Sequence, residues 1–174
     1  MEHLWSPWRL AYVTDSARTA GCVFCDVQLD STAQGSLIVH RGRTCFVILN
    51  LYPYNSGHLM VVPNRHVGSL VAASTDELTE LIELTRIAEA ALTEAYSPQG
   101  MNMGINLGKP AGAGVLDHLH MHIVPRWNGD TNFMTIVGEA RVLPEELPVA
   151  AARLRPIFER LAVTPAAISI QPGP

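Results

Sequence analysis

Three histidines recur at every second position in the second half of the chain. His118, His120 and His122 alternate with the apolar residues Leu119 and Met121. Because strand side chains alternate between two faces, a strand here would place the three imidazoles on one face. With seven histidines in the chain, chance spacing is the weaker explanation. An imidazole can attack phosphorus or bind a metal, but three from one straight strand splay too far apart to share one zinc ion.

A glycine-rich segment, residues 106–115, directly precedes the histidines and contains Gly108, Gly112 and Gly114. Glycines let backbone N–H groups approach an anion closely, although glycine-rich turns are also common in hairpins. Beside a row of imidazoles, this segment favours phosphate binding. We therefore expect an imidazole to attack phosphorus, giving a covalent phosphoramidate that a second acceptor cleaves.

Two of the three cysteines, Cys22 and Cys25, form a C-x-x-C motif. This spacing is typical of half a zinc site, and two further ligands would complete it. The alternatives are a redox pair or two core cysteines, but a thioredoxin-like pair would open a helix after a strand, and no strand is expected before Gly21. Cys45 lies in an apolar run and is expected to be a small core residue.

The elements that must position these residues follow an α+β pattern. We expect strands at residues 36–39, 44–49, 58–62, 101–107 and 118–124. Ser74 and Glu77 form a capping box that predicts a long amphipathic helix over 76–95. A second helix over 145–161 is expected to bury Leu154, Ile157, Phe158 and Leu161. This order predicts a mostly antiparallel sheet with helices on one face.

The length of 174 residues favours a single domain, 1–174, with an irregular N-terminal arm over 1–35 and a loose tail over 165–174. A net charge of -4 disfavours an extended nucleic-acid-binding face. The apolar runs are far shorter than the roughly 20 residues of a membrane span. The absence of a signal peptide and the odd cysteine count predict a cytoplasmic protein. His3 and His40 are expected at the surface.

Residues 118–124 resemble the H-φ-H-φ-H-φ-φ signature of the histidine triad superfamily of nucleotide hydrolases and transferases. Residues 50–63 look like the ribose-side segment of that family, and 106–114 look like its phosphate loop. Residues 127–133 are similar to the bacterial branch of diadenosine tetraphosphate phosphorylases and hydrolases. The resemblance covers about residues 4–160. It implies a HIT-like fold of about five strands with a long helix and a C-terminal helix packed on them, and a homodimer.

The resemblance also implies roles for individual residues. His120 matches the nucleophile, with its Nδ1–H expected to bond a carbonyl of its own strand; His122 matches the donor to phosphate, and His58 completes the network behind it. Asn50 matches the residue on the ribose hydroxyls, and Trp127 is expected beside the nucleotide or the leaving group. The phosphate contacts match Asn106 and the backbone at Gly112, Ala113, Gly114 and Val115. Some relatives have a serine at the position of Gly114, so this chain retains only backbone donors there.

Zinc-bearing relatives, including galactose-1-phosphate uridylyltransferase, suggest the two missing metal ligands. The matching positions are His66, after the proline of the second strand, and His118, the first histidine of the triad. The implied site is Cys22, Cys25, His66 and His118 around a structural zinc ion that does not activate water.

The expected activity is hydrolysis or phosphorolysis of a dinucleoside polyphosphate through a nucleotidyl-His120 intermediate. Three alternatives remain open: a nucleotide-binding sensor or scaffold with little turnover, a hydrolase of nucleoside phosphoramidates or other nucleotide conjugates, and a hydrolase whose zinc performs the chemistry. Neither nucleic acid nor a membrane is expected as a partner.

Overall fold

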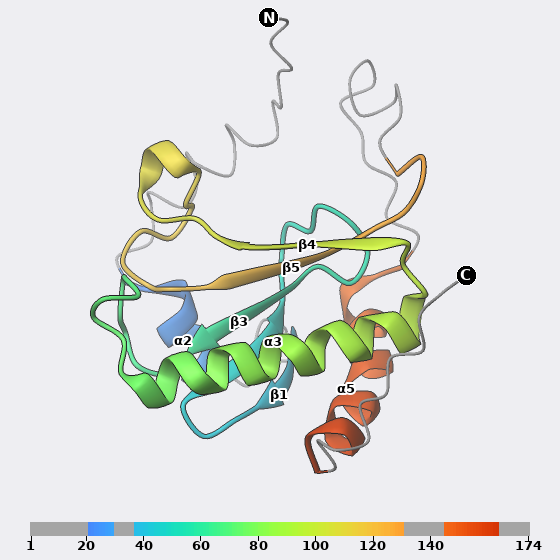
Figure 1. The fold of residues 1–174 in the computed structure, drawn as a ribbon, viewed down its shortest axis with the longest axis horizontal. Helices are drawn as coiled ribbons and strands as arrows, with labels where there is room; N and C mark the ends of the chain where they lie inside the picture. Colours follow the sequence, from blue (N-terminus) through green and yellow to red (C-terminus); the bar gives the residue numbers. More distant parts are fainter. Residues whose placement is uncertain (1–20, 30–36, 131–144, 164–174) are drawn as a thin grey trace, which may run out of the picture.

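The computed structural model describes residues 21–29, 37–130 and 145–163 (Figure 1). The predicted tail, most of the predicted arm, His3 and residues 131–133 lie outside these ranges. The elements, in chain order, are α2 (Val23–Leu29), β1 (Ile38–Arg41), β2 (Cys45–Leu49), β3 (Leu59–Pro63), α3 (Thr75–Tyr96), β4 (Gly100–Ile105), η2 (Lys109–Ala111), β5 (Met121–Arg126) and α5 (Leu147–Val163).

The five strands form one sheet in the order β1-β2-β3-β5-β4, and every neighbouring pair is antiparallel. All residues of the central strands β2 and β3 are buried. The helix α3 packs against β2, β3 and β5, whereas α5 packs against β1 and α3. Figure 1 shows α3 running across the sheet with α5 behind its C-terminal end. The predicted α+β fold is therefore confirmed.

The same face of the sheet carries both long helices. Cys45 of β2 donates its thiol hydrogen to the carbonyl of Glu77 in α3 at 3.5 Å. His40, which pairs with Val47 and so shares its face, stacks on Phe158 of α5 at 5.8 Å. Burial raises the pKa of the Cys45 thiol to about 11, so it stays protonated, as expected of a core residue. His40 is half-buried by this stack, and its expected surface position is wrong.

The long helix predicted over 76–95 is observed at Thr75–Tyr96. The hydroxyl of Ser74 accepts from the Glu77 amide at 3.2 Å, and the Glu77 carboxylate accepts from the Ser74 amide at 2.7 Å. The predicted capping box is thus confirmed. In α5, Leu154, Phe158 and Leu161 are buried as expected, while Ile157 is only partly buried. Within the described ranges, no helix is long and apolar enough to cross a bilayer.

The strands expected at 36–39 and 101–107 lie at Ile38–Arg41 and Gly100–Ile105, and two further differences concern the site. The segment after Cys22 is the helix α2 rather than irregular chain, because Phe24 and Val27 are spaced to bury one helical face. The last strand begins at Met121 rather than at His118. The ladder with β3 ends at the pair of Val61 and Met121; before it, the Leu119 amide donates to the Val67 carbonyl and the His118 ring donates to the Pro63 carbonyl at 2.8 Å.

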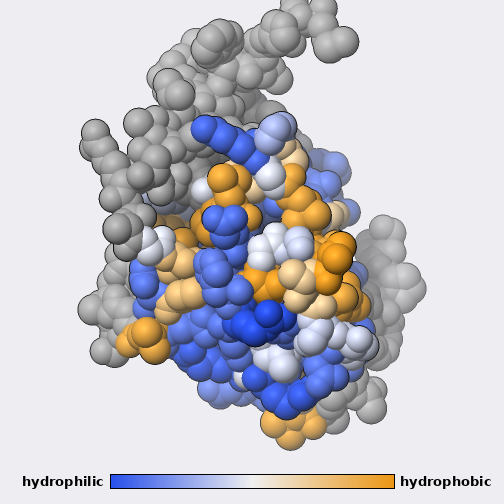
Figure 2. Space-filling model, turned by 90° about the vertical axis from the view of Figure 1, so that its left-hand side faces the viewer, coloured by the Kyte–Doolittle hydropathy of each residue, from blue (hydrophilic) through white to orange (hydrophobic). Residues whose placement is uncertain are grey.

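Two carboxylates of α3 hold the loops around the sheet. Glu80 accepts from the backbone N–H groups of Arg43, at 2.8 Å, and of Thr44 and Cys45. A Cβ at Gly42 would lie 2.8 Å from that carboxylate, so the turn requires glycine there. Figure 2 shows the face of the molecule that lies on the left in Figure 1. Hydrophobic and hydrophilic residues both occur on this face, and no single hydrophobic area dominates it.

The second carboxylate, Glu77, accepts bidentate hydrogen bonds from Nε and Nη2 of Arg65, at 2.9 and 2.7 Å. It also accepts from the Ser74 amide. Hydrogen bonds from Arg65 and Ser74 hold the pKa of Glu77 at about 2, below its ordinary value of 4.5. The pair therefore fixes the segment just after β3 to the start of α3.

We expect Glu77→Gln to lower the free energy of unfolding by about 2 kcal/mol at pH 7, because it removes charge-assisted bonds. Because the pKa of Glu77 is lowered in the folded state, its charged carboxylate stabilises the fold at pH values above the unfolded pKa. The difference in unfolding free energy between Glu77→Gln and the unsubstituted protein should therefore shrink as pH falls from 4.5 toward 2. Urea unfolding at several pH values measures this. Glu83→Gln, exposed on the same helix, should change little. A difference independent of pH would contradict the assignment.

Candidate active site

His120 is held in a single protonation form by its own backbone. Its Nδ1 lies 2.8 Å from the carbonyl oxygen of His118, which can only accept, so Nδ1 carries the proton. The Nε2 atom therefore presents a lone pair. The side chain is 5% exposed, and burial lowers the pKa of His120, which favours the neutral ring. The expected backbone bond is present, and it leaves Nε2 in the form a nucleophile needs.

A second chain of hydrogen bonds fixes His122. The Tyr54 amide donates to His58 Nδ1 at 3.1 Å, which makes that atom an acceptor and places the proton of His58 on Nε2. His58 Nε2 is 3.0 Å from His122 Nδ1, so the proton of His122 must lie on Nε2. Burial, with a smaller contribution from His120, lowers the pKa of His122 to about 4. A neutral His122 can thus donate from Nε2 to an oxyanion.

Asn50, the predicted ribose residue, lies at the end of β2 beside this network. Its Oδ1 accepts from the Tyr52 amide at 2.9 Å, and its Nδ2 is 3.4 Å from His58 Nε2. The ring of Tyr54 stacks on His58 with centroids 4.9 Å apart. Asn50, His58 and His122 are therefore neighbours in space, although they come from three different strand ends.

The glycine-rich loop folds around the short helix Lys109–Ala111, and Gly112 adopts a left-handed φ of 93° that favours glycine. Two of the four predicted amides, Gly112 and Ala113, donate to carbonyls inside the loop at 3.0 and 3.3 Å. The N–H groups of Gly114 and Val115 take no part in these internal bonds. Of the four predicted amides, those of Gly112 and Ala113 are thus engaged within the loop itself.

The four predicted metal ligands converge at one point. Cys22 Sγ is 3.1 Å from His118 Nδ1, Cys25 Sγ is 3.4 Å from His66 Nδ1, and all four ligand atoms lie within 4.8 Å of one another. A tetrahedral zinc ion would separate sulfur from nitrogen ligands by about 3.6 Å. The Nε2 of His118 donates to the Pro63 carbonyl at 2.8 Å, so Nδ1 faces the thiols. The geometry and the donor set fit zinc.

Phe24 of α2 packs between His118, one of the candidate metal ligands, and His120. Its ring centroid lies 5.4 Å from that of His118 and 5.2 Å from that of His120. The imidazoles of His120 and His122 are also in edge contact, at 4.9 Å. The four rings therefore form one packed group, and a displacement of α2 would reach His120 directly.

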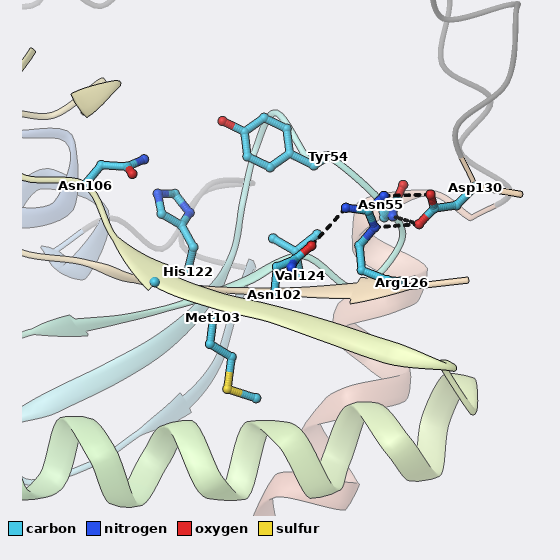
Figure 3. A pocket seen from close by; sticks show the side chains of 10 residues that line it. Tyr54, Asn55, Asn102, Met103, Asn106, His122, Val124, Arg126 and Asp130 are labelled. Atoms are coloured by element: carbon cyan, nitrogen blue, oxygen red, sulfur yellow. Dashed lines mark hydrogen bonds and ion pairs between the residues drawn. The ribbon is translucent and has the colours of Figure 1, made fainter. Parts of the chain in front are cut away.

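A cavity of about 430 Å³ opens beside His122 (Figure 3). It is lined by Tyr54, Asn55, Asn102, Met103, Gly104, Asn106, His122, Val124, Arg126 and Asp130. Of the predicted residues it brings together His122 and Asn106, whereas His120, Asn50 and Trp127 do not line it. Trp127 is half-buried at the end of β5, where its amide donates to Asp130 at 3.1 Å.

Sequence reasoning missed several residues of this site. Tyr54 and Asp130 lie inside the segments that carried the resemblance and Arg126 lies between two of them, but no local pattern shows that they meet His58 or line a cavity. Asn102 lies in a strand whose spacing showed no chemistry, and Phe24 was read as part of an irregular arm. These contacts depend on the sheet register and on the position of α2. Neither can be predicted from the type of a single residue.

The profile of the HIT domain family matches residues 31–129. A relative from Mycobacterium tuberculosis named AP-4-A phosphorylase is 40% identical over 155 residues, covering 84% of this chain and 79% of the relative. A hypothetical histidine triad nucleotide-binding protein from Sulfolobus tokodaii has a similar structure, with a TM-score of 0.68 and 26% identity, over 86% of this chain and all of the other.

A zinc-bound histidine triad family protein from Mycobacterium smegmatis is also similar, with a TM-score of 0.64 and 27% identity. The alignment covers 85% of this chain and 98% of that structure. The fold, the histidine row and these matches agree. The chain belongs to the HIT domain family.

Proposed function

We propose that this protein transfers or hydrolyses nucleotidyl groups of dinucleoside polyphosphates, such as diadenosine tetraphosphate, through a covalent nucleotidyl-His120 intermediate. The observation that carries the proposal is the fixed proton on His120 Nδ1, which leaves a neutral Nε2 beside the donor Nε2–H of His122. The name of the Mycobacterium tuberculosis relative, AP-4-A phosphorylase, supports the substrate class.

The chemistry has two steps. His120 Nε2 attacks the α-phosphorus, the P–N bond forms, and the P–O bond to the departing nucleoside polyphosphate breaks. The ring becomes cationic while Nδ1–H still donates to the His118 carbonyl, which stabilises that charge. His122 donates to a phosphate oxygen, with the amides of Gly114 and Val115 and the side chain of Asn106 as further donors. Water or inorganic phosphate then cleaves the P–N bond and restores His120.

We further propose that zinc bound by Cys22, Cys25, His66 and His118 is structural. The two sulfurs and two nitrogens complete a tetrahedral set, and the zinc-bound relative supports the metal. Bound zinc would supply a cross-link between α2 and the segment that leads into β5. His118 would bind zinc through its ring and holds His120 through its carbonyl, so a bound zinc ion would help to position the nucleophile without touching substrate. A cytoplasmic location would keep both thiols reduced.

A homodimer is the assembly we propose, through α3 and the sheet edge. The edge strand β4 supports it, because four of its six residues are exposed, including Met103 at 41%. An exposed edge strand tends to be paired or covered in a folded assembly.

His120→Ala should abolish turnover of diadenosine tetraphosphate and leave AMP affinity within about threefold, because the ring supplies the nucleophile rather than the binding surface. His120→Gly should regain measurable turnover when free imidazole is added. Steady-state kinetics and calorimetry measure the two quantities. Undiminished turnover in His120→Ala would exclude the covalent mechanism, whereas no turnover by the unsubstituted protein would leave a binding protein.

The products identify the second acceptor. Since the relative is named a phosphorylase, we expect ATP and ADP from diadenosine tetraphosphate when inorganic phosphate is present. Without phosphate, slow release of AMP and ATP is expected. Chromatography of both mixtures decides the matter, and equal AMP release in both would identify a hydrolase.

Removing zinc with a chelator, or substituting Cys25→Ser, should lower the melting temperature by several degrees, because the arm loses its cross-link to the sheet. Calorimetric melting and metal analysis measure this. Cys45→Ser, at the core thiol outside the cluster, should retain one zinc per chain. An apo-protein that melts at the unchanged temperature but lacks activity would indicate a catalytic metal instead.

A further inference from the structure

The loop between β2 and β3 carries Tyr54, whose backbone N–H sets the proton positions of His58 and His122. The side chain of the next residue, Asn55, points away from these rings toward the end of β5 (Figure 3). We propose that Asn55 is a positioning residue: it hydrogen-bonds this loop to β5, so that the Tyr54 amide stays on His58 and His122 keeps its proton on Nε2. The inference rests on the proposed function, in which that proton meets a phosphate oxygen.

The pair of His58 and His122 can hold its protons in two ways. In the arrangement set by the Tyr54 amide, His58 donates from Nε2 to Nδ1 of His122, and His122 presents Nε2–H. In the reversed arrangement, His58 carries its proton on Nδ1, His122 donates from Nδ1 to His58, and Nε2 of His122 presents a lone pair. The separation of 3.0 Å suits both arrangements. A lone pair repels a phosphate oxygen, so the proposed chemistry requires the first arrangement.

Asn50 favours the reversed arrangement. Its Oδ1 accepts from the Tyr52 amide at 2.9 Å, which leaves Nδ2 facing His58 Nε2 at 3.4 Å. Because Nδ2 of an amide can only donate, this contact is a hydrogen bond only when His58 Nε2 accepts. The Tyr54 amide, 3.1 Å from His58 Nδ1, opposes it, because that contact is a bond only when Nδ1 accepts. The proton positions therefore depend on how firmly the Tyr54 amide is held.

Asn55 holds the loop through two hydrogen bonds to the end of β5. Its Nδ2 donates to the Pro125 carbonyl at 2.9 Å and to the Asp130 carboxylate at 2.8 Å. The ladder between β3 and β5 ends on this side at the pair of Leu59 and Ile123, and Pro125, further along β5, has no N–H group with which to extend it. The Asn55 side chain thus supplies a cross-link where the backbone ladder stops.

Asp130 gives this cross-link a fixed partner. Its carboxylate accepts from Nε and Nη2 of Arg126, at 2.6 and 2.8 Å, and from the Trp127 amide at 3.1 Å. The side chain of Asp130 is only 11% exposed. The backbone carbonyl of Asn55 meanwhile accepts from the His58 amide at 3.2 Å. Asn55 therefore connects the end of β5 to the histidine whose proton position is at stake.

The cross-link requires the terminal amide of asparagine. The Pro125 carbonyl can only accept, and the Asp130 carboxylate does so here, so the side chain must bring two hydrogens on one nitrogen. An aspartate of nearly the same shape would bring none and would place a second negative charge beside Asp130. Asn55→Ala and Asn55→Asp therefore both remove the cross-link, and the second does so at nearly constant side-chain volume.

Nitrogen-15 NMR of the imidazoles, in protein purified with its metal, reports which ring nitrogen carries the proton. The unsubstituted protein should show the proton on Nε2 in His58 and His122 and on Nδ1 in His120. In Asn55→Ala, most of the His58 and His122 population should move to the Nδ1 form. His120 should not change, because its proton is fixed by the His118 carbonyl.

Steady-state kinetics on the same proteins tests the consequence for the reaction. Asn55→Ala should lower kcat for diadenosine tetraphosphate about tenfold, because exchanging one hydrogen bond for another shifts an equilibrium by roughly that factor. KM should change by less than about twofold, since the lost donor acts on charge that develops in the transition state. Across the variants, kcat should fall in proportion to the fraction of His122 that keeps its Nε2 proton. Asn55→Asp should show the same changes.

Gln99→Ala is the matched control. The Gln99 side chain accepts from the Asn128 amide at 2.7 Å, in the turn after β5, so the variant removes a hydrogen bond at the same end of the strand and leaves those of Asn55 in place. The proton positions, kcat and KM should match the unsubstituted protein. All variants should melt within a few degrees of it.

The positioning role is overturned if His58 of the unsubstituted protein carries its proton on Nδ1, or if Asn55→Ala keeps the native proton positions. It is also overturned if the protons move without a fall in kcat, if KM rises at constant kcat, or if Gln99→Ala shows equal changes. If the intact protein fails to turn over diadenosine tetraphosphate while the protons still move in Asn55→Ala, the proposed function fails and the role of Asn55 in fixing the protons stands. Full turnover with unmoved protons leaves the proposed function standing alone.

Discussion

The structure of the site depends on His118, which acts through both its ring and its backbone. The ring Nε2 is tied to the carbonyl of Pro63, which turns Nδ1 toward the cysteines, while the carbonyl of His118 receives the Nδ1 proton of His120. One residue thus couples the end of β3, the metal-binding cluster and the nucleophile. The ladder between β3 and β5 ends at Val61 and Met121, so His118 and His120 lie just outside the strand pairing.

The proton positions of His58 and His122 follow from a single amide. Because the Tyr54 N–H points at His58 Nδ1, the proton of His58 must face His122, and the proton of His122 must face outward. Burial keeps His120 and His122 neutral by lowering both pKa values. The site therefore combines an electron-pair donor and a proton donor of the same residue type, because Nδ1 of His120 donates to a backbone carbonyl while Nδ1 of His122 accepts from His58.

Short-range patterns predicted much of this arrangement. The capping box of Ser74 and Glu77 and the alternation around His120 need only neighbouring residues, and the resemblance supplied the partners of Cys22 and Cys25. The start of β5, the helix α2 and the engaged amides of Gly112 and Ala113 could not be predicted, because each depends on contacts between distant segments. Arg126, Asp130 and Gly104 share a cavity only through sheet register, which the sequence does not state.

The helix α2 has only seven residues, and an isolated helix of that length is not stable in water. Its order must therefore come from what it touches, which includes a histidine 93 positions away from Cys25 along the chain. During synthesis in a cell, α2 would therefore become ordered only after the ribosome has released the segment that contains His118. Any chain truncated before that point would carry two unshielded thiols and no means of sheltering them.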